Sequence, residues 1–153
     1  MIHDRAWIAA RIPHAGSMCL LDGVVSWSQD AIHCRASSHR EAGNPLRAAG
    51  RLGIANGIEY AAQAMAVHGA LRAGSDAAPR AGFLTSVREV EFLAASLDGE
   101  ADLDLHAECL NGDGNHLMYA FRVEAAGTPL ITGRASVMLD ADSELQAPGA
   151  PAA

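Results

Sequence analysis

Lysine is absent from the 153-residue sequence, and cysteine is scarce. Every one of the eleven Lys-or-Arg positions is an arginine, against eighteen acidic residues, and the formal net charge is −7 at pH 7. An acidic chain repels a phosphate backbone, so DNA and RNA are not expected as main partners. The three cysteines are widely spaced and form no C-x-x-C pattern, which predicts free thiols in a reducing compartment.

Targeting and membrane signals are also missing. The first seven residues contain no basic stretch followed by an apolar run, so no signal peptide is expected and the predicted location is cytoplasmic. The longest apolar stretch, residues 54–71, is interrupted by Asn56, Glu59, Gln63 and His68. These polar side chains exclude a membrane span.

Cofactor motifs are missing as well. No glycine-rich loop opens a helix, because Gly112-x-Gly114 has the character of a hairpin turn. His33, His106 and His116 do not have the close spacing of a ligand set. We therefore expect neither a cofactor nor a bound metal.

The chain has the size of one ordinary domain. Half of its residues are hydrophobic, which is enough for a core, and no internal repeat is visible. After Asp140 the sequence is rich in Ala, Pro and Gly. We expect a single domain over residues 1–140 and a flexible tail over residues 141–153.

The order of predicted elements indicates an α+β fold. Two helices are expected, a short one over Asp4–Ile12 capped by Asp4 and a long one over Ile54–Arg72 that is apolar nearly all round. The predicted strands are Val24–Ser28, Ala31–Ala36, Phe83–Phe92, Asp102–Cys109, Leu117–Glu124 and Leu130–Leu139. Turns are expected at 29–30, 111–114 and 127–129. One curved antiparallel sheet wrapped around a long central helix satisfies this order.

Glu59 is the most informative residue of the long helix. A carboxylate is costly to bury without a partner, yet Glu59 stands among Ala, Ile, Met, Tyr and Val. It either reaches solvent at the helix start, where the helix dipole favours it, or is kept there for chemistry. Gln63 follows four residues later, so the two polar groups are expected on one face.

Two segments carry a resemblance to a known family. Residues 12–24, IPHAGSMCLLDGV, resemble the Pro-His…Leu-Leu-x-Asp-x-Val segment that opens 3-hydroxyacyl-acyl-carrier-protein dehydratases. Residues 59–64, EYAAQA, resemble their central-helix motif Glu-x-x-Ala-Gln, in which the Glu is catalytic. The chain looks closest to the divergent branch encoded with aryl polyene and related pathways. The resemblance implies a hotdog fold and a dimer.

One departure from the family pattern concerns the catalytic pair. The housekeeping dehydratases carry a Gly-His-Phe-Pro-Gly loop whose histidine precedes the catalytic Glu by fourteen positions. Counting back fourteen positions from Glu59 reaches Pro45, so the usual histidine is absent. Only the Glu half of the pair carries over by direct match.

Dehydration needs a base for the C2 proton and an acid for the leaving hydroxyl. In a dry groove a carboxyl group favours its neutral form, so Glu59 could act as the acid. His14, which lies in a matched segment, is the first candidate for the base, with a structural role as its alternative. His39, in the loop that replaces the missing motif, comes second, with a solvated loop position as its alternative. His68 falls on roughly the opposite helix face and is discounted.

The remaining predicted site residues bind substrate or carrier. Amides at the start of the long helix could polarise a thioester carbonyl. The candidates for substrate binding are Gln63, Asn44, Asn56 and Gly57. Arg47 and Arg51 lie in the loop before the helix and are candidates for docking an acidic acyl carrier protein with its phosphopantetheine arm, or else are solvated arginines that balance nearby acids.

These observations lead to one leading function and two rivals. The leading prediction is dehydration of a 3-hydroxyacyl thioester on acyl carrier protein to the trans-2-enoyl thioester, by a homodimer or a heterodimer with a hotdog paralogue. An acyl thioesterase, in which Glu59 activates water, is the second. The third is a catalytically weakened hotdog subunit that supports an active paralogue, because the loop histidine is missing.

Overall fold

The computed structural model describes residues 1–12, 16–74, 82–113 and 115–139. The elements, in chain order, are β1 (His3–Asp4), α1 (Arg5–Ala9), β2 (Gly23–Trp27), β3 (Ala31–Ala36), α2 (Gly57–Ala73), β4 (Gly82–Phe92), β5 (Leu103–Asp113), β6 (His116–Ala125) and β7 (Thr128–Leu139). Short 3₁₀ turns cover residues 16–18, 38–40 and 54–56. The predicted tail over 141–153 lies outside the described residues.

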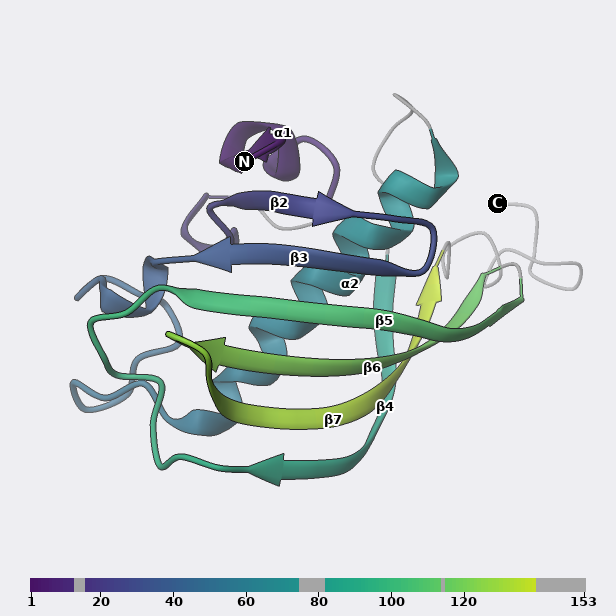
Figure 1. The fold of residues 1–153 in the computed structure, drawn as a ribbon. Coiled ribbons are helices and arrows are strands. Elements are labelled where there is room, and N and C mark those ends of the chain that lie inside the picture. Colours follow the sequence, from purple (N-terminus) through teal and green to yellow (C-terminus); the bar gives the residue numbers. More distant parts are fainter. Residues whose placement is uncertain (13–15, 75–81, 114, 140–153) are drawn as a thin grey trace, which may run out of the picture.

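The strands form one curved sheet around α2 (Figure 1). Their order is β1-β2-β3-β5-β6-β7-β4, with antiparallel pairing at each step. Helix α2 packs against β3, β5, β6 and β7. This confirms the predicted sheet wrapped around a central helix. It also places β4, the strand that follows α2, at one edge of the sheet.

Helix α2 is buried on most of its circumference. Side chains in every turn are inaccessible, among them Tyr60, Met65 and His68. Apart from Ile58 and the last residues of the helix, one stripe is the exception, because Glu59, Ala62, Ala66 and Ala70 are partly exposed. These four residues follow the three- and four-residue spacing of a single helix face. The helix is therefore enclosed as expected, except along a stripe of small residues that begins at Glu59.

The strands obey the predicted alternation. On β5, Leu103, Leu105 and Ala107 are buried against the helix, while Asp104 and His106 point to the other face. The core therefore lies between the inner face of the sheet and α2. Asp4 caps α1 as expected, since its Oδ1 accepts a hydrogen bond from Trp7 N at 2.9 Å. Helix α1 ends at Ala9, three residues earlier than predicted.

Two predicted turns were wrong in position. β6 and β7 are joined by Ala126 and Gly127, with φ of 49° and 78°, and Pro129 lies inside β7. Two consecutive left-handed residues match the right-handed twist of a two-residue hairpin, which a turn at Pro129 would not. Likewise, Asn111 and Gly112 belong to β5, because Asp113 pairs with His116.

Candidate active site at the start of the central helix

Glu59 stands in the first turn of α2 and is partly exposed. Asn56, the residue that precedes the helix, makes no side-chain cap; its Nδ2 donates to Gly53 O at 3.1 Å instead. The 3₁₀ turn over residues 54–56 leads directly into α2, since Asn56 N donates to Gly53 O and Gly57 N to Ile54 O. The positive end of the helix dipole still lies near Glu59.

Gly57 has a packing role that the sequence did not reveal. It is buried, and a side-chain Cβ at this position would overlap Ile131 Cδ1 and lie 3.3 Å from Leu97 Cδ2. The glycine therefore lets the helix start approach β7 closely. Its missing side chain makes room for the core on that side rather than for a substrate.

Gln63 is fully buried, whereas Glu59, four residues earlier on the helix, is partly exposed. Its Oε1 accepts a hydrogen bond from Leu20 N at 2.9 Å, and its Nε2 donates to Met18 O at 2.6 Å. Because both ends of the amide bind backbone, Gln63 ties the segment before β2 to the helix. The geometry favours a positioning role over substrate binding, which stays a prediction for Gln63.

A second polar network joins the loop before the helix to Tyr60. The Ser38 hydroxyl donates to Leu20 O at 2.8 Å and lies 2.7 Å from Tyr60 Oη. Asn44 Nδ2 donates to Tyr60 Oη at 3.0 Å and to Ser38 O at 2.9 Å. Asn44 is buried, and its Oδ1 accepts from Leu46 N. Asn44 thus holds the loop on the helix, and a substrate-binding role for it stays a prediction that this geometry does not favour.

Sequence reasoning missed Tyr60 and Ser38 as positioning residues. The signal was present, since a tyrosine hydroxyl in an apolar helix needs a hydrogen-bond partner once it is buried. The two networks meet at Leu20, whose N–H binds Gln63 and whose carbonyl binds Ser38. The two segments flanking the helix start are therefore fixed to the turn that follows Glu59.

The candidate bases differ in their surroundings. His14 lies outside the described residues, so its role stays a prediction. His39 was expected to be solvated if it was not catalytic, and that expectation was wrong. Its ring is 1% exposed, with Nε2 bonded to Ala101 O at 2.9 Å and Nδ1 without a partner among the described residues. Burial lowers the pKa of His39 below its usual value, and the hydrogen bond to Ala101 O opposes this effect only in part.

His68 is buried on the far side of the helix, as its discounting implied. Its Nε2 donates to Ser28 O at 2.8 Å, which leaves Nδ1 to accept from the Tyr119 hydroxyl at 2.8 Å. Burial lowers the pKa of His68 and raises the pKa of Tyr119. This pair holds α2 to β6 and lies away from Glu59.

The buried histidines predict a stability that declines in mild acid. Because burial lowers the pKa of His39 and His68, the unfolded chain binds more protons than the folded chain below about pH 6.5. The free energy of unfolding should therefore keep its full value above that pH and decrease as the pH drops toward 5. Urea titrations across this range measure it, and His68→Gln, which keeps one donor and one acceptor, should flatten the curve. An equally steep curve in that variant would contradict the assignment.

Arg47 is held in place rather than presented to solvent. Its guanidinium donates to Asp98 Oδ1 at 2.8 Å and to the carbonyls of His39 and Gly50, and its Nε donates to Glu41 O. With these groups committed, Arg47 organises the loop, and carrier docking by Arg47 stays a prediction that this geometry does not favour. Arg51 is exposed, and docking by Arg51 likewise stays a prediction.

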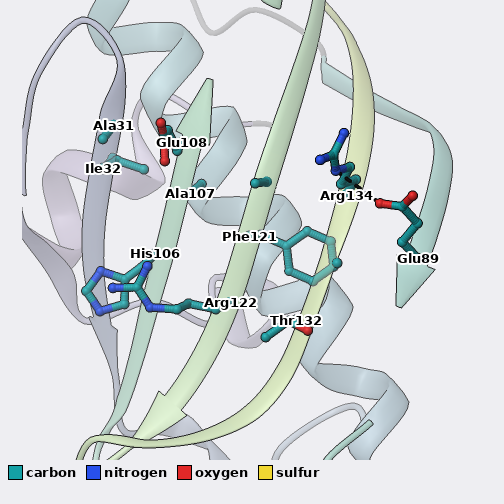
Figure 2. A pocket seen from close by; sticks show the side chains of 12 residues that line it. Ala31, Ile32, Glu89, His106, Ala107, Glu108, Phe121, Arg122, Thr132 and Arg134 are labelled. Carbon is teal, nitrogen blue, oxygen red and sulfur yellow. Dashed lines mark ion pairs between the residues drawn. The ribbon is translucent and has the colours of Figure 1, made fainter. Parts of the chain in front are cut away.

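A groove on the face of the sheet away from α2 has a volume of about 490 Å³. Figure 2 shows the side chains that line it. Ala120 and Gly133 belong to its lining, and Arg122 and Arg134 flank it from neighbouring strands. None of the residues predicted for catalysis lines it. Among the described residues, no group of three or more His, Cys, Asp or Glu side chains could hold a metal ion. The described helices include none long and apolar enough to cross a membrane.

A curved antiparallel sheet around one helix, with a carboxylate in the first turn of that helix, defines a protein of the hotdog class. A family model described as ApeP dehydratase matches residues 6–147. The chain therefore belongs to the ApeP-like dehydratase family, which confirms the predicted branch and the predicted class of enzyme. Among curated protein sequences, none matches this chain significantly.

Solved structures agree with this family. The dehydratase heterocomplex ApeI:P from Xenorhabdus doucetiae has a chain 26% identical to this one, with a TM-score of 0.81, covering 91% of this chain and 94% of that chain. A mutant thioesterase from Pseudomonas aeruginosa and a hypothetical thioesterase from Streptococcus pneumoniae are both 11% identical, with TM-scores of 0.56 and 0.54. They cover 78% and 76% of this chain, and 80% and 83% of theirs. At that identity they show the fold alone.

Proposed function

We propose that this chain dehydrates a 3-hydroxyacyl thioester carried on acyl carrier protein to the trans-2-enoyl thioester, in a dimer with a second hotdog chain. The position of Glu59 carries the proposal. It begins the stripe of α2 that the chain's own sheet leaves partly open. Because the chain belongs to a dehydratase family, this partly open position supports a catalytic role for the carboxyl group, and a second subunit that covers the stripe would complete the pocket.

The proposed step is a proton abstraction coupled to loss of water. A base removes a proton from C2, the electron pair forms the C2=C3 double bond, and the C3–O bond breaks. Glu59 donates a proton to the departing hydroxyl, which leaves as water. The positive end of the α2 dipole favours the charge that develops on the thioester oxygen.

We infer that the base is His14 or a residue of the partner chain. The rings of His39 and His68 are buried and bonded to backbone carbonyls. His33 and His106 stack on each other, with ring centres 4.2 Å apart, on the face of the sheet away from the helix. The absence of the loop histidine, combined with these placements, favours a partner that supplies it.

The edge strand β4 offers the place for such a partner. It ends the sheet with eleven residues, whereas β1 at the other edge has only two. Leu84 and Phe92 on β4 are exposed, and so is Leu93 beside it. An edge with unpaired backbone groups and exposed apolar side chains suits pairing with a second chain. The ApeI:P heterocomplex supports a hotdog paralogue as that chain.

A turnover assay tests the proposal. The purified chain is given a 3-hydroxyacyl carrier thioester, alone and with a hotdog paralogue that carries the loop histidine. We expect the enoyl product, followed by its absorbance, to form at least about tenfold faster in the mixture, since the partner completes the acid–base pair. Free thiol, measured in parallel, would identify a thioesterase instead. Absence of enoyl product in both preparations would contradict the proposal.

A further inference from the structure

A second groove, lined by residues of β4, β5, β6 and β7, has a volume of about 440 Å³. Its polar lining consists of Thr85, Ser86, Arg88, Asn111, His116 and Ser136. Each of these side chains can donate a hydrogen bond, and no described carboxylate lines the groove. In a chain with a net charge of −7, such a lining is unusual.

Of two arginines that are paired across β4 and β7, only Arg88 lines this groove. Arg88 on β4 is directly opposite Arg134 on β7, and the next pair on the same face is Ser86 with Ser136. Like charges opposite each other across two strands destabilise a sheet. The charge of Arg134 is compensated by Glu89, whose Oε2 lies 3.1 Å from Arg134 Nε (Figure 2). Arg88 is exposed and forms no ion pair with any described residue.

The local backbone keeps the nearest acid out of the groove. Glu89 has a φ of 53° and sits where the register between β4 and β7 shifts. This bulge leaves Glu89 outside the groove that Arg88 lines with Asn111 and His116. Glu89 lines an adjoining smaller hollow together with Arg88 and Arg134, and there its carboxylate is paired with Arg134. By comparison, Arg35, Arg40, Arg47 and Arg122 each pair with a carboxylate. The positive charge of Arg88 therefore stays available to a ligand.

The other donors complete a site for an oxyanion. The Thr85 hydroxyl donates to Ser136 O at 3.2 Å, whereas those of Ser86 and Ser136 make no hydrogen bond to the described residues. A guanidinium with hydroxyl and amide donors matches the geometry of a phosphate group. Leu117, Met118 and Val137 add apolar lining, which suits the organic part of a ligand better than a bare ion.

We infer that this groove binds an organic phosphate, with Arg88 holding the phosphate and Ser86, Ser136 and Asn111 supplying further donors. Two sources share this chemistry, the phosphopantetheine arm of a carrier protein and the nucleotide end of coenzyme A. The inference concerns binding alone, so it holds or fails independently of the proposed dehydration.

Titrations followed by amide chemical shifts test the groove. The probes are coenzyme A and its two halves, 4′-phosphopantetheine and adenosine 3′,5′-bisphosphate. Saturable shifts at Ser86, Asn111 and Ser136 are expected with coenzyme A and with at least one half, and the half that binds identifies the source. Arg88→Gln should weaken binding about tenfold or more. Arg122→Gln, on the same face but paired with Glu124, is the matched control and should change it less than about twofold.

Two results would overturn the inference. One is the absence of saturable shifts with all three probes at low ionic strength, where attraction between charges is strongest. The other is an equal loss of affinity in Arg88→Gln and Arg122→Gln, which would show attraction to the whole face rather than a site at Arg88.

Discussion

Glu59→Gln is expected to lower turnover about 10²-fold or more while the protein stays folded. The substitution keeps the size of the side chain and removes the proton that the leaving hydroxyl must receive. Glu59 stands on the partly exposed stripe of α2, outside the buried contacts of the helix with the sheet. The loss should therefore appear in kcat rather than in the thermal midpoint.

The measurement needs the dimer that turns over, because a chain without its base has little activity to lose. Glu108→Gln is the matched control, since this exposed carboxylate of β5 lies on the opposite face of the sheet. It should retain the full rate. If Glu59→Gln also retained the full rate, Glu59 could not be the acid, and the proposed chemistry would fail with it.

Gly57→Ala should destabilise the protein by about 1–3 kcal/mol, as overpacking of a buried site does. The added methyl would collide with Ile131 Cδ1, and Ile131 is fully buried. The free-energy cost of this collision exceeds the gain from the higher helix propensity of alanine, which is at most about 1 kcal/mol. Because Glu59 lies two residues farther along α2, a shift of the helix start should also lower turnover.

Ile131→Val provides the rescue, because it removes the Cδ1 methyl that the new alanine side chain would meet. Alone it should cost about 0.5–1.5 kcal/mol, yet combined with Gly57→Ala it should be more stable than Gly57→Ala alone. Gly53→Ala is the control, since the nearest atom to its Cβ is Asn56 Nδ2 at 3.7 Å. Urea unfolding of the single and double variants measures the coupling. Strict additivity of the two substitutions would show that this contact is not the cause.

Much of the fold follows from local patterns in the sequence. The long helix was predicted because apolar residues surround it, and the strands because Leu103, Leu105 and Ala107 alternate with polar residues. Both patterns follow from which faces of the helix and strands are buried, and the folded protein buries those same faces. Turn positions were less predictable, since Ala126-Gly127 adopts a hairpin conformation that strand pairing imposes.

The candidate site, like the fold, could be predicted only in part from the sequence. Glu59 could be singled out because a carboxylate in an apolar helix is costly, and the missing loop histidine was visible by counting positions. The inward orientation of Gln63 could not be predicted, because it depends on the backbone N–H of Leu20, forty-three residues away. The same holds for Arg47, whose partner Asp98 is fifty-one residues distant.

By itself, the sequence determined the class of fold, the family and the position of the one carboxylate suited to the chemistry. These depend on residue types and short-range spacing, which are readable along the chain. Only the tertiary structure decided which polar side chains are committed to holding loops and which remain available, as with Arg47 and Arg88. Hydrogen bonds and ion pairs form between residues far apart in sequence, so their partners exist only after the sheet has closed around the helix.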